Sequence, residues 1–205
     1  MHVVFLDLDG VTHPLGIKPT GIVVNGKPLV RATSVDYFCW LPFLVNAVLK
    51  APGVYIVIHS MWRKSHSLET IKTKIASRWP DLDLSRIIDS TNPNLSKKSS
   101  IEEWMSKQTR VVKSFIILDD ALEFEHYDQW IACESESGLS DIHVQEKIQH
   151  WINRYQNMDR LVKAIHTSPL FEVKNILASI QHALHRNPAS FDNDAAPSGP
   201  KDNQS

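Results

Sequence analysis

The amino-acid sequence predicts a Rossmann-like α/β domain, in which helices flank a parallel sheet. Three short apolar runs, at residues 3–6, 54–58 and 114–118, have the length and composition of buried parallel strands. Helical patterns separate these runs, and strand–helix–strand alternation is typical of parallel sheets with right-handed crossovers. Each run ends in polar or acidic residues, which then lie beyond the carboxyl ends of the strands, where such sheets bind ligands.

The composition is that of an ordinary globular protein. Of the 205 residues, 42% are apolar and 22% charged, which suggests one domain with an appendage. The net charge of −1 excludes a global basic field for nucleic acid, although a local basic patch stays open. Two cysteines, Cys39 and Cys133, are too few for a disulfide framework and suit a reducing compartment. No apolar run reaches the length of a membrane span, and no leader pattern precedes the first strand, so we expect no membrane partner and a cytoplasmic location.

Two aspartates, Asp7 and Asp9, follow the first apolar run and precede Gly10, which permits a sharp exit from the strand. Strand periodicity places both carboxylates on one side. Carboxylates this close repel each other unless a cation lies between them, and an all-oxygen site suits Mg²⁺. The backbone carbonyl of Leu8 or Asp9 can face the same ion. A loop of two solvated acids and a calcium loop are the alternatives, but a calcium loop starting at Asp7 needs Glu where this chain has Lys18.

Weaker signals predict the remaining elements. We expect a β-hairpin at 21–30, helices at 42–50 and 68–79, a short strand at 86–89, a helix after 99, a strand within 126–133, a helix opening at 140–141 and a helix at 175–185. The turn Asn25-Gly26 is the strongest short hairpin signal. A capping box, Ser99-x-x-Glu102, marks the start of the helix after 99. The predicted organisation is a domain at 1–154, a helical extension at 155–187 and a disordered tail at 188–205.

The segment from Phe5 to His13 reads FLDLDGVTH and resembles motif I of the haloacid dehalogenase-like (HAD) hydrolases. In that superfamily the first aspartate is the nucleophile that takes up a phosphoryl group. The second is the general acid and base, and its backbone carbonyl helps to hold Mg²⁺. The resemblance therefore implies these roles for Asp7 and Asp9. An aspartate can form an acyl phosphate, which divides one difficult displacement into two easier steps.

Three further positions resemble the other HAD motifs. Ser60 closes an apolar strand as in motif II, where the hydroxyl binds the phosphoryl group. Lys97 fits the spacing of the motif III lysine, and Lys98 remains the alternative. Asp119 and Asp120 resemble the acidic pair of motif IV, which implies that Asp120 binds Mg²⁺ directly and that Asp119 orients Lys97 or a metal-bound water.

The run from Ser60 to Arg63 also resembles the Ser-x-Trp-Arg signature of the HAD domain attached to RNA-repair proteins. A turn at 138–140 before the last helix is similar to the same branch, and the resemblance covers residues 3–152. We expect Arg63 to contact a phosphate or a remote substrate group, with a surface salt bridge or helix cap as the equal alternative. Trp62 is expected to pack in the core or at the rim.

The resemblance implies a Mg²⁺-dependent phosphatase whose substrate is a small molecule, a nucleotide or a nucleic-acid end. A phosphotransferase or mutase and a non-catalytic binding module are the alternatives. The gaps between the motifs are too short for a separate cap domain, which needs about 50 residues. We therefore expect an open site with a minimal cap, screened by the hairpin as a flap, that favours bulky substrates through outer contacts with Lys27, Arg31 or Arg63.

Overall fold

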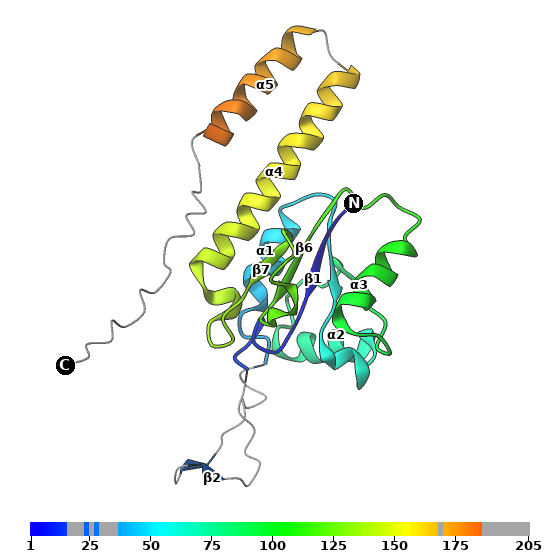
Figure 1. Cartoon of the computed structure of the whole chain (residues 1–205), viewed down its shortest axis with the longest axis vertical. Helices are drawn as coiled ribbons and strands as arrows, with labels where there is room; N and C mark the ends of the chain where they lie inside the picture. The colour runs from blue at the N-terminus through cyan, green and yellow to red at the C-terminus, as the bar shows by residue number, and fades with distance from the viewer. Residues whose placement is uncertain (16–22, 25–26, 29–36, 168–169, 186–205) are drawn as a thin grey trace, which may run out of the picture. The chain divides into compact units, whose positions relative to one another are not determined.

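A five-stranded parallel sheet forms the centre of the unit made by residues 1–156 (Figure 1). The computed structural model describes residues 1–15, 23–24, 27–28, 37–167 and 170–185. The strand order is β5-β4-β1-β6-β7. The bounds are β1 His2–Leu6, β4 Val54–Ile58, β5 Ile87–Ser90, β6 Ser114–Asp119 and β7 Trp130–Ala132. This topology confirms the predicted α/β class and makes β1 the central strand, so both neighbours of β1 can place residues beside its carboxyl end.

Helices cover both faces of the sheet. They are α1 Leu41–Leu49, α2 Leu68–Arg78, α3 Lys97–Ser106 and α4 Ile142–Thr167, with single turns at η1 Met61–Lys64, η2 Leu122–Phe124 and η3 Gly138–Ser140. Successive side chains of a strand point to opposite faces of the sheet, so the core has one part on each face. Val4 and Leu6 pack with buried residues of α1, α2 and the first half of α4. Val3 and Phe5 point to the opposite face and pack with α3 and η2.

The start of α3 differs from the predicted capping box. Ser96, three residues earlier than Ser99, is the N-cap, and its hydroxyl accepts a hydrogen bond from the Ser99 backbone N–H at 3.1 Å. Both serines can cap a helix, and the use of the earlier one adds a turn to α3. In that turn the Ser100 side chain is buried, and its hydroxyl donates to the Lys97 carbonyl at 2.7 Å. Lys97 therefore becomes the first residue of the helix.

A short antiparallel pair lies in the region of the predicted hairpin. β2 Val23–Val24 pairs with β3 Lys27–Pro28. The turn at Asn25-Gly26, and with it the predicted flap contact, lies outside the described residues. Arg31 and the predicted tail at 188–205 also lie outside them.

Contacts within the chain define two compact units, residues 1–156 and 157–205. Helix α4 runs without a break through the predicted boundary at 154/155. The second unit contains the rest of α4 and α5 Leu170–His185, which begins five residues before the predicted helix at 175. Over the described residues, no helix combines the length and the apolar character that crossing a membrane requires.

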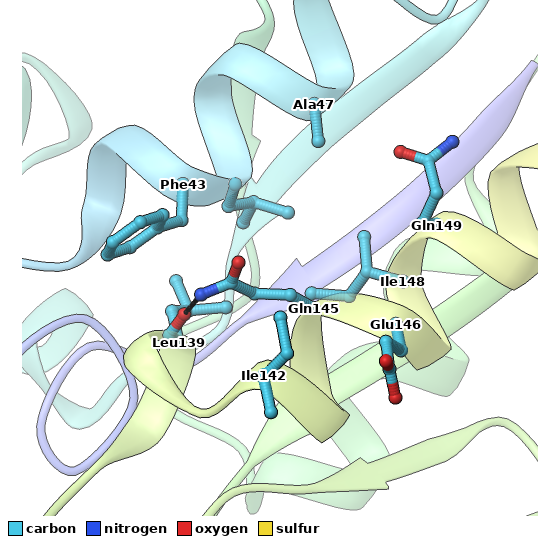
Figure 2. A pocket seen from close by; sticks show the side chains of 9 residues that line it. Phe43, Ala47, Leu139, Ile142, Gln145, Glu146, Ile148 and Gln149 are labelled. Carbon is cyan, nitrogen blue, oxygen red and sulfur yellow. Dashed lines mark hydrogen bonds between the residues drawn. The ribbon is translucent and has the colours of Figure 1, made fainter.

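A shallow groove of about 260 Å³ lies between α1 and the start of α4 (Figure 2). Phe43 and Ile142 contribute its apolar walls, and the Gln145 side chain donates a hydrogen bond to the Leu139 carbonyl at 2.9 Å. None of the aspartates at the carboxyl ends of the strands lines this groove.

Candidate active site

Parallel pairing brings the acidic strand ends together. Leu6 of β1 pairs with Leu118 of β6, so Asp7 and Asp119 follow at neighbouring positions, and the Asp7 N–H donates to the Leu118 carbonyl at 3.0 Å. Carboxylate oxygens of Asp7, Asp119 and Asp120 all lie within 4.8 Å of one another. Three carboxylates at this separation repel one another and create a demand for positive charge.

Lys97 supplies one positive charge to this cluster. Its Nζ lies 2.5 Å from Asp7 Oδ2 and 2.8 and 2.7 Å from the two oxygens of Asp119. Burial alone would lower the pKa of Lys97, but the two carboxylates outweigh burial and raise it, so the ammonium stays charged. Lys98 points elsewhere, with its Nζ 5.4 Å from the ring centre of Tyr127. Of the two lysines offered by the sequence, the structure therefore brings Lys97 to the aspartates.

The Asp7 carboxyl is buried in this cluster. Burial is the main cause that raises its pKa to about 6, and repulsion from Asp119 adds to it, while Lys97 acts in the opposite direction. The Leu8 N–H donates to Asp7 Oδ1 at 2.8 Å, and Lys97 holds the other oxygen. The carboxylate is thus oriented by two donors, as a nucleophile needs to be.

The donor set fits a hard divalent cation such as Mg²⁺, because all its candidate ligands are oxygens. Asp119 already accepts from Lys97 through both oxygens and from the Ala121 N–H at 2.9 Å. These hydrogen bonds favour Asp119 as the residue that orients Lys97. They leave Asp120 as the candidate that would bind the cation directly. Asp120 is itself oriented by the Ser135 hydroxyl, which donates to Oδ2 at 2.7 Å.

The backbone around the two motif I aspartates has an occupied carbonyl at Leu8 and a left-handed conformation at Gly10. The Leu8 carbonyl accepts from the Thr12 N–H at 2.8 Å and from the Thr12 hydroxyl at 2.9 Å. The sequence offered the backbone carbonyls of Leu8 and Asp9 as metal ligands. Because the Leu8 carbonyl is already occupied by Thr12, the Asp9 carbonyl remains as the candidate. Gly10 has φ +73°, and a Cβ at this position would overlap the Asp120 carboxylate, so glycine is required for the two loops to approach.

The Asp9 carboxylate turns away from the acidic cluster. His13 Nε2 lies 3.0 Å from Oδ1, and Trp62 Nε1 donates to Oδ2 at 2.9 Å. Burial acts to raise the pKa of Asp9, but the hydrogen bonds of His13 and Trp62 outweigh it and lower the pKa. Sequence reasoning missed both partners of Asp9: it treated Trp62 as a packing residue, and the Asp9-to-His13 spacing of four was the available signal for the other.

Ser60 is fully buried at the end of β4, and its hydroxyl accepts from the Trp62 N–H at 3.3 Å. It also forms a hydrogen bond that favours the ionised form of Asp7 and so lowers the pKa of that carboxyl. The predicted motif II residue therefore lies beside the predicted nucleophile.

Arg63 requires a correction. The prediction gave it a contact with a phosphate or a remote substrate group, or else a surface salt bridge or a helix cap, but its side chain is buried and its guanidinium binds backbone carbonyls of two segments. The acceptors are His59 at 2.9 Å, Ser60 at 2.8 Å, Asn92 at 3.3 Å and Leu95 at 3.2 Å. Arg63 thus joins the turn after β4 to the loop that leads into α3, because its planar fork can satisfy carbonyls from two segments at once. It thereby connects the segment that carries Ser60 to the loop that precedes Lys97.

The turn at η3 packs against the motif I loop. The Leu139 N–H donates to the Val11 carbonyl at 2.9 Å. Gly138 has φ +43°, and a Cβ there would overlap the Val11 carbonyl and the Trp40 ring. The Gly-Leu-Ser turn is therefore a structural contact of the loop that carries Asp7 and Asp9.

Comparison with known families agrees with this geometry. The family model described as "HAD domain in Swiss Army Knife RNA repair proteins" matches residues 3–144, more than half of the chain. No curated protein and no solved structure gives a significant match. The match covers the sheet from Val3 of β1 to the end of β7 and every aspartate of the cluster, from Asp7 to Asp120. The chain therefore belongs to the family of HAD domains found in Swiss Army Knife RNA repair proteins.

Proposed function

We propose that this protein is a Mg²⁺-dependent phosphatase that hydrolyses phosphomonoesters through an aspartyl-phosphate on Asp7. The observation that carries the proposal is the buried Asp7–Lys97–Asp119 arrangement, with Asp120 and Asp9 beside it. A buried carboxylate oriented by a lysine and a backbone N–H suits nucleophilic attack better than a structural role, because burying this many acids is costly. The family assignment agrees with a hydrolase of this class.

The residues divide the reaction into two steps. Asp7 attacks phosphorus while the ester oxygen leaves with a proton from Asp9, which forms the aspartyl-phosphate. Asp9 then removes a proton from water, which attacks phosphorus and releases phosphate and free Asp7. Lys97 and the Ser60 hydroxyl stabilise the charge on the phosphoryl oxygens in both steps. A bound Mg²⁺, held by Asp7, Asp120 and the Asp9 carbonyl, would neutralise phosphate charge and orient the phosphoryl group.

The experiment that tests the proposal measures phosphate release from sugar phosphates, nucleotides and 5′- or 3′-phosphorylated oligonucleotides, with Mg²⁺ and with excess chelator. We expect Mg²⁺-dependent release from at least one class. Phosphate that appears on an added alcohol rather than in solution would indicate a phosphotransferase instead. No turnover of any substrate would favour the non-catalytic alternative.

We further propose a bulky substrate, such as a phosphorylated nucleic-acid end. Residues 61–96, all of them described, contain only η1, α2 and β5, so no cap domain is inserted between motifs II and III. The segment between motifs I and II is too short for one as well, since a packed domain needs about 50 residues. An open site encloses small metabolites poorly. The description of the matching family, which names RNA repair proteins, supports the same class.

Mg²⁺ is expected to raise the melting temperature of the unchanged protein, because a ligand that binds only the folded state stabilises it. Asp120→Ala should abolish this response and should raise the melting temperature without metal, since it removes one of three mutually repelling carboxylates. Thermal denaturation with 0 to about 100 Kd of Mg²⁺, where the stabilisation is about 2.7 kcal/mol, measures both effects. A full Mg²⁺ response in Asp120→Ala would show that Asp120 is not a ligand.

The apparent Mg²⁺ affinity is expected to depend on pH through Asp7. Because the pKa of Asp7 is raised to about 6, the folded protein without metal holds a proton there at pH 5, and the cation must displace it. Affinity should be constant above about pH 7 and fall roughly tenfold per pH unit below pH 6. Calorimetric titration at several pH values measures the affinity. Equal affinity at pH 7 and pH 5 would contradict the prediction.

A further inference from the structure

We propose that His13 and Trp62 are positioning residues that hold Asp9 in one orientation for its two proton transfers. The inference rests on the proposed phosphatase function and extends it, because it assigns a role to two residues that have none in the reaction proposed above. In the proposed reaction Asp9 first gives a proton to the leaving oxygen and then takes one from water. Both transfers need the same carboxyl group at the same place.

The two oxygens of Asp9 are held by different segments of the chain. Oδ1 meets His13 Nε2 at 3.0 Å, and His13 lies in the loop after Gly10. Oδ2 accepts from Trp62 Nε1 at 2.9 Å. Trp62 is the second residue of η1, the turn that follows Ser60. The Asp9 side chain is 39% exposed and that of His13 only 1%. The carboxyl group is therefore accessible to solvent, whereas His13 is buried and Trp62 is partly buried.

The hydrogen bonds of His13 fix its orientation. The Thr12 hydroxyl donates its single proton to the Leu8 carbonyl at 2.9 Å, so it can only accept from His13 Nδ1, 2.9 Å away. Nδ1 therefore carries a hydrogen, and Nε2 faces Asp9. The ring is thereby oriented with Nε2 towards Asp9 Oδ1, so His13 links the carboxyl group of Asp9 to the backbone of the same loop through Thr12 and Leu8.

Both rings pack against other aromatic rings, which restricts their orientations. The His13 ring meets the rings of Tyr37, Phe38 and Trp62 edge-on, with centroids 5.0, 5.6 and 6.1 Å apart. The Trp62 ring also stacks on His66 at 5.3 Å. Arg63, next in sequence, ties the turn of Trp62 to the Asn92 and Leu95 carbonyls. A carboxyl group held from such fixed rings loses little entropy when it reaches the transition state.

The test uses three substitutions in the full chain. Trp62→Phe removes the N–H and keeps an aromatic ring. His13→Asn keeps an amide near the Nδ1 position but leaves Asp9 Oδ1 without its partner, whereas His13→Gln can place an amide N–H near the Nε2 position. Trp104→Phe is the matched control, because Trp104 Nε1 also donates to an aspartate, Asp89, at 2.7 Å.

The measurement is kcat/KM for 4-nitrophenyl phosphate, which has a good leaving group, and for an alkyl phosphate, which has a poor one. General acid catalysis contributes about 10²–10⁴-fold, mainly for poor leaving groups. We expect Trp62→Phe and His13→Asn to lose about 10–100-fold on the alkyl phosphate but only a few-fold on the nitrophenyl ester. His13→Gln should recover part of the loss, and Trp104→Phe should change both substrates equally and little.

Equal losses on the two substrates in Trp62→Phe and His13→Asn would overturn the inference and leave the phosphatase function intact. The same losses in Trp104→Phe would also overturn it, because they would reflect a general effect of removing a tryptophan. Absence of hydrolysis of these two esters and of every substrate class in the screen described above would overturn the proposed function itself, and the inference with it. The two histidine variants keep the test decisive if Trp62→Phe does not fold.

Discussion

Asp7→Asn is expected to lower the rate of phosphate release by about 10³-fold or more, because the amide has no charged oxygen to attack phosphorus. The volume of the side chain barely changes, so the loss should lie in kcat and leave the fold intact. Beryllium fluoride mimics a phosphoryl group on a carboxylate, and we expect it to bind the unchanged protein in the presence of Mg²⁺ and fail to bind Asp7→Asn. Steady-state kinetics and thermal shift with the fluoride measure the two effects.

The same substitution has an expected effect on stability of opposite sign. An acid whose folded pKa is raised to about 6 from 3.8 destabilises the folded state when ionised, so stability without metal falls as the pH rises through this window. At pH 8, Asp7→Asn should therefore raise the free energy of unfolding by about 3 kcal/mol, and near pH 4 the difference should vanish.

Asp81→Asn is the control for Asp7→Asn, because Asp81 is an exposed aspartate outside the cluster. It should leave turnover and the free energy of unfolding at pH 8 close to those of the unchanged protein. Turnover of Asp7→Asn at the level of the control would refute an aspartyl-phosphate on Asp7. A loss of stability at pH 8 would mean that the ion pair with Lys97 outweighs the cost of burying the carboxylate.

Lys97→Met is expected to lower the free energy of unfolding by about 3 kcal/mol at pH 8 without metal, because it leaves two buried carboxylates without their cation. The raised pKa of Lys97 means that its contribution is complete at neutral pH and is lost only above the ordinary lysine range. Towards pH 5 the loss should shrink, since Asp7 then takes up a proton. Turnover should fall about 10²–10³-fold, the usual cost of removing one group that stabilises transition-state charge.

Lys98→Met is the matched control, because it changes the same residue type at the next position. Its ammonium lies over the Tyr127 ring, a contact worth about 0.5–1 kcal/mol at an exposed site. Denaturant unfolding at pH 8 and pH 5 and steady-state kinetics should separate the two variants clearly. Equal losses in Lys97→Met and Lys98→Met would show that the two lysines share the role.

The sequence alone determined the fold class and where chemistry is concentrated. Apolar runs that end in Asp7, Ser60 and Asp119 are local patterns, and in a parallel sheet the carboxyl ends of neighbouring strands must meet. The confirmed sheet brings these ends together through the pairing of β1 with β4 and β6. Boundaries were less accurate where two serines, Ser96 and Ser99, offered equivalent caps, because the choice between them depends on what the extra turn buries.

The tertiary structure decided which partner each polar side chain meets. Adjacent lysines are chemically alike, and only the start of α3 at Lys97 aims one of them at the aspartates. Arg63 is buried and links two segments that are distant in sequence, because its guanidinium donates to the carbonyls of both His59 and Leu95. Trp62 lies 53 residues from Asp9, and its hydrogen bond exists only once β1 and β4 are paired. Sequence patterns report local periodicity and residue chemistry, whereas these contacts arise from the register of the sheet and the packing of the loops at its carboxyl edge.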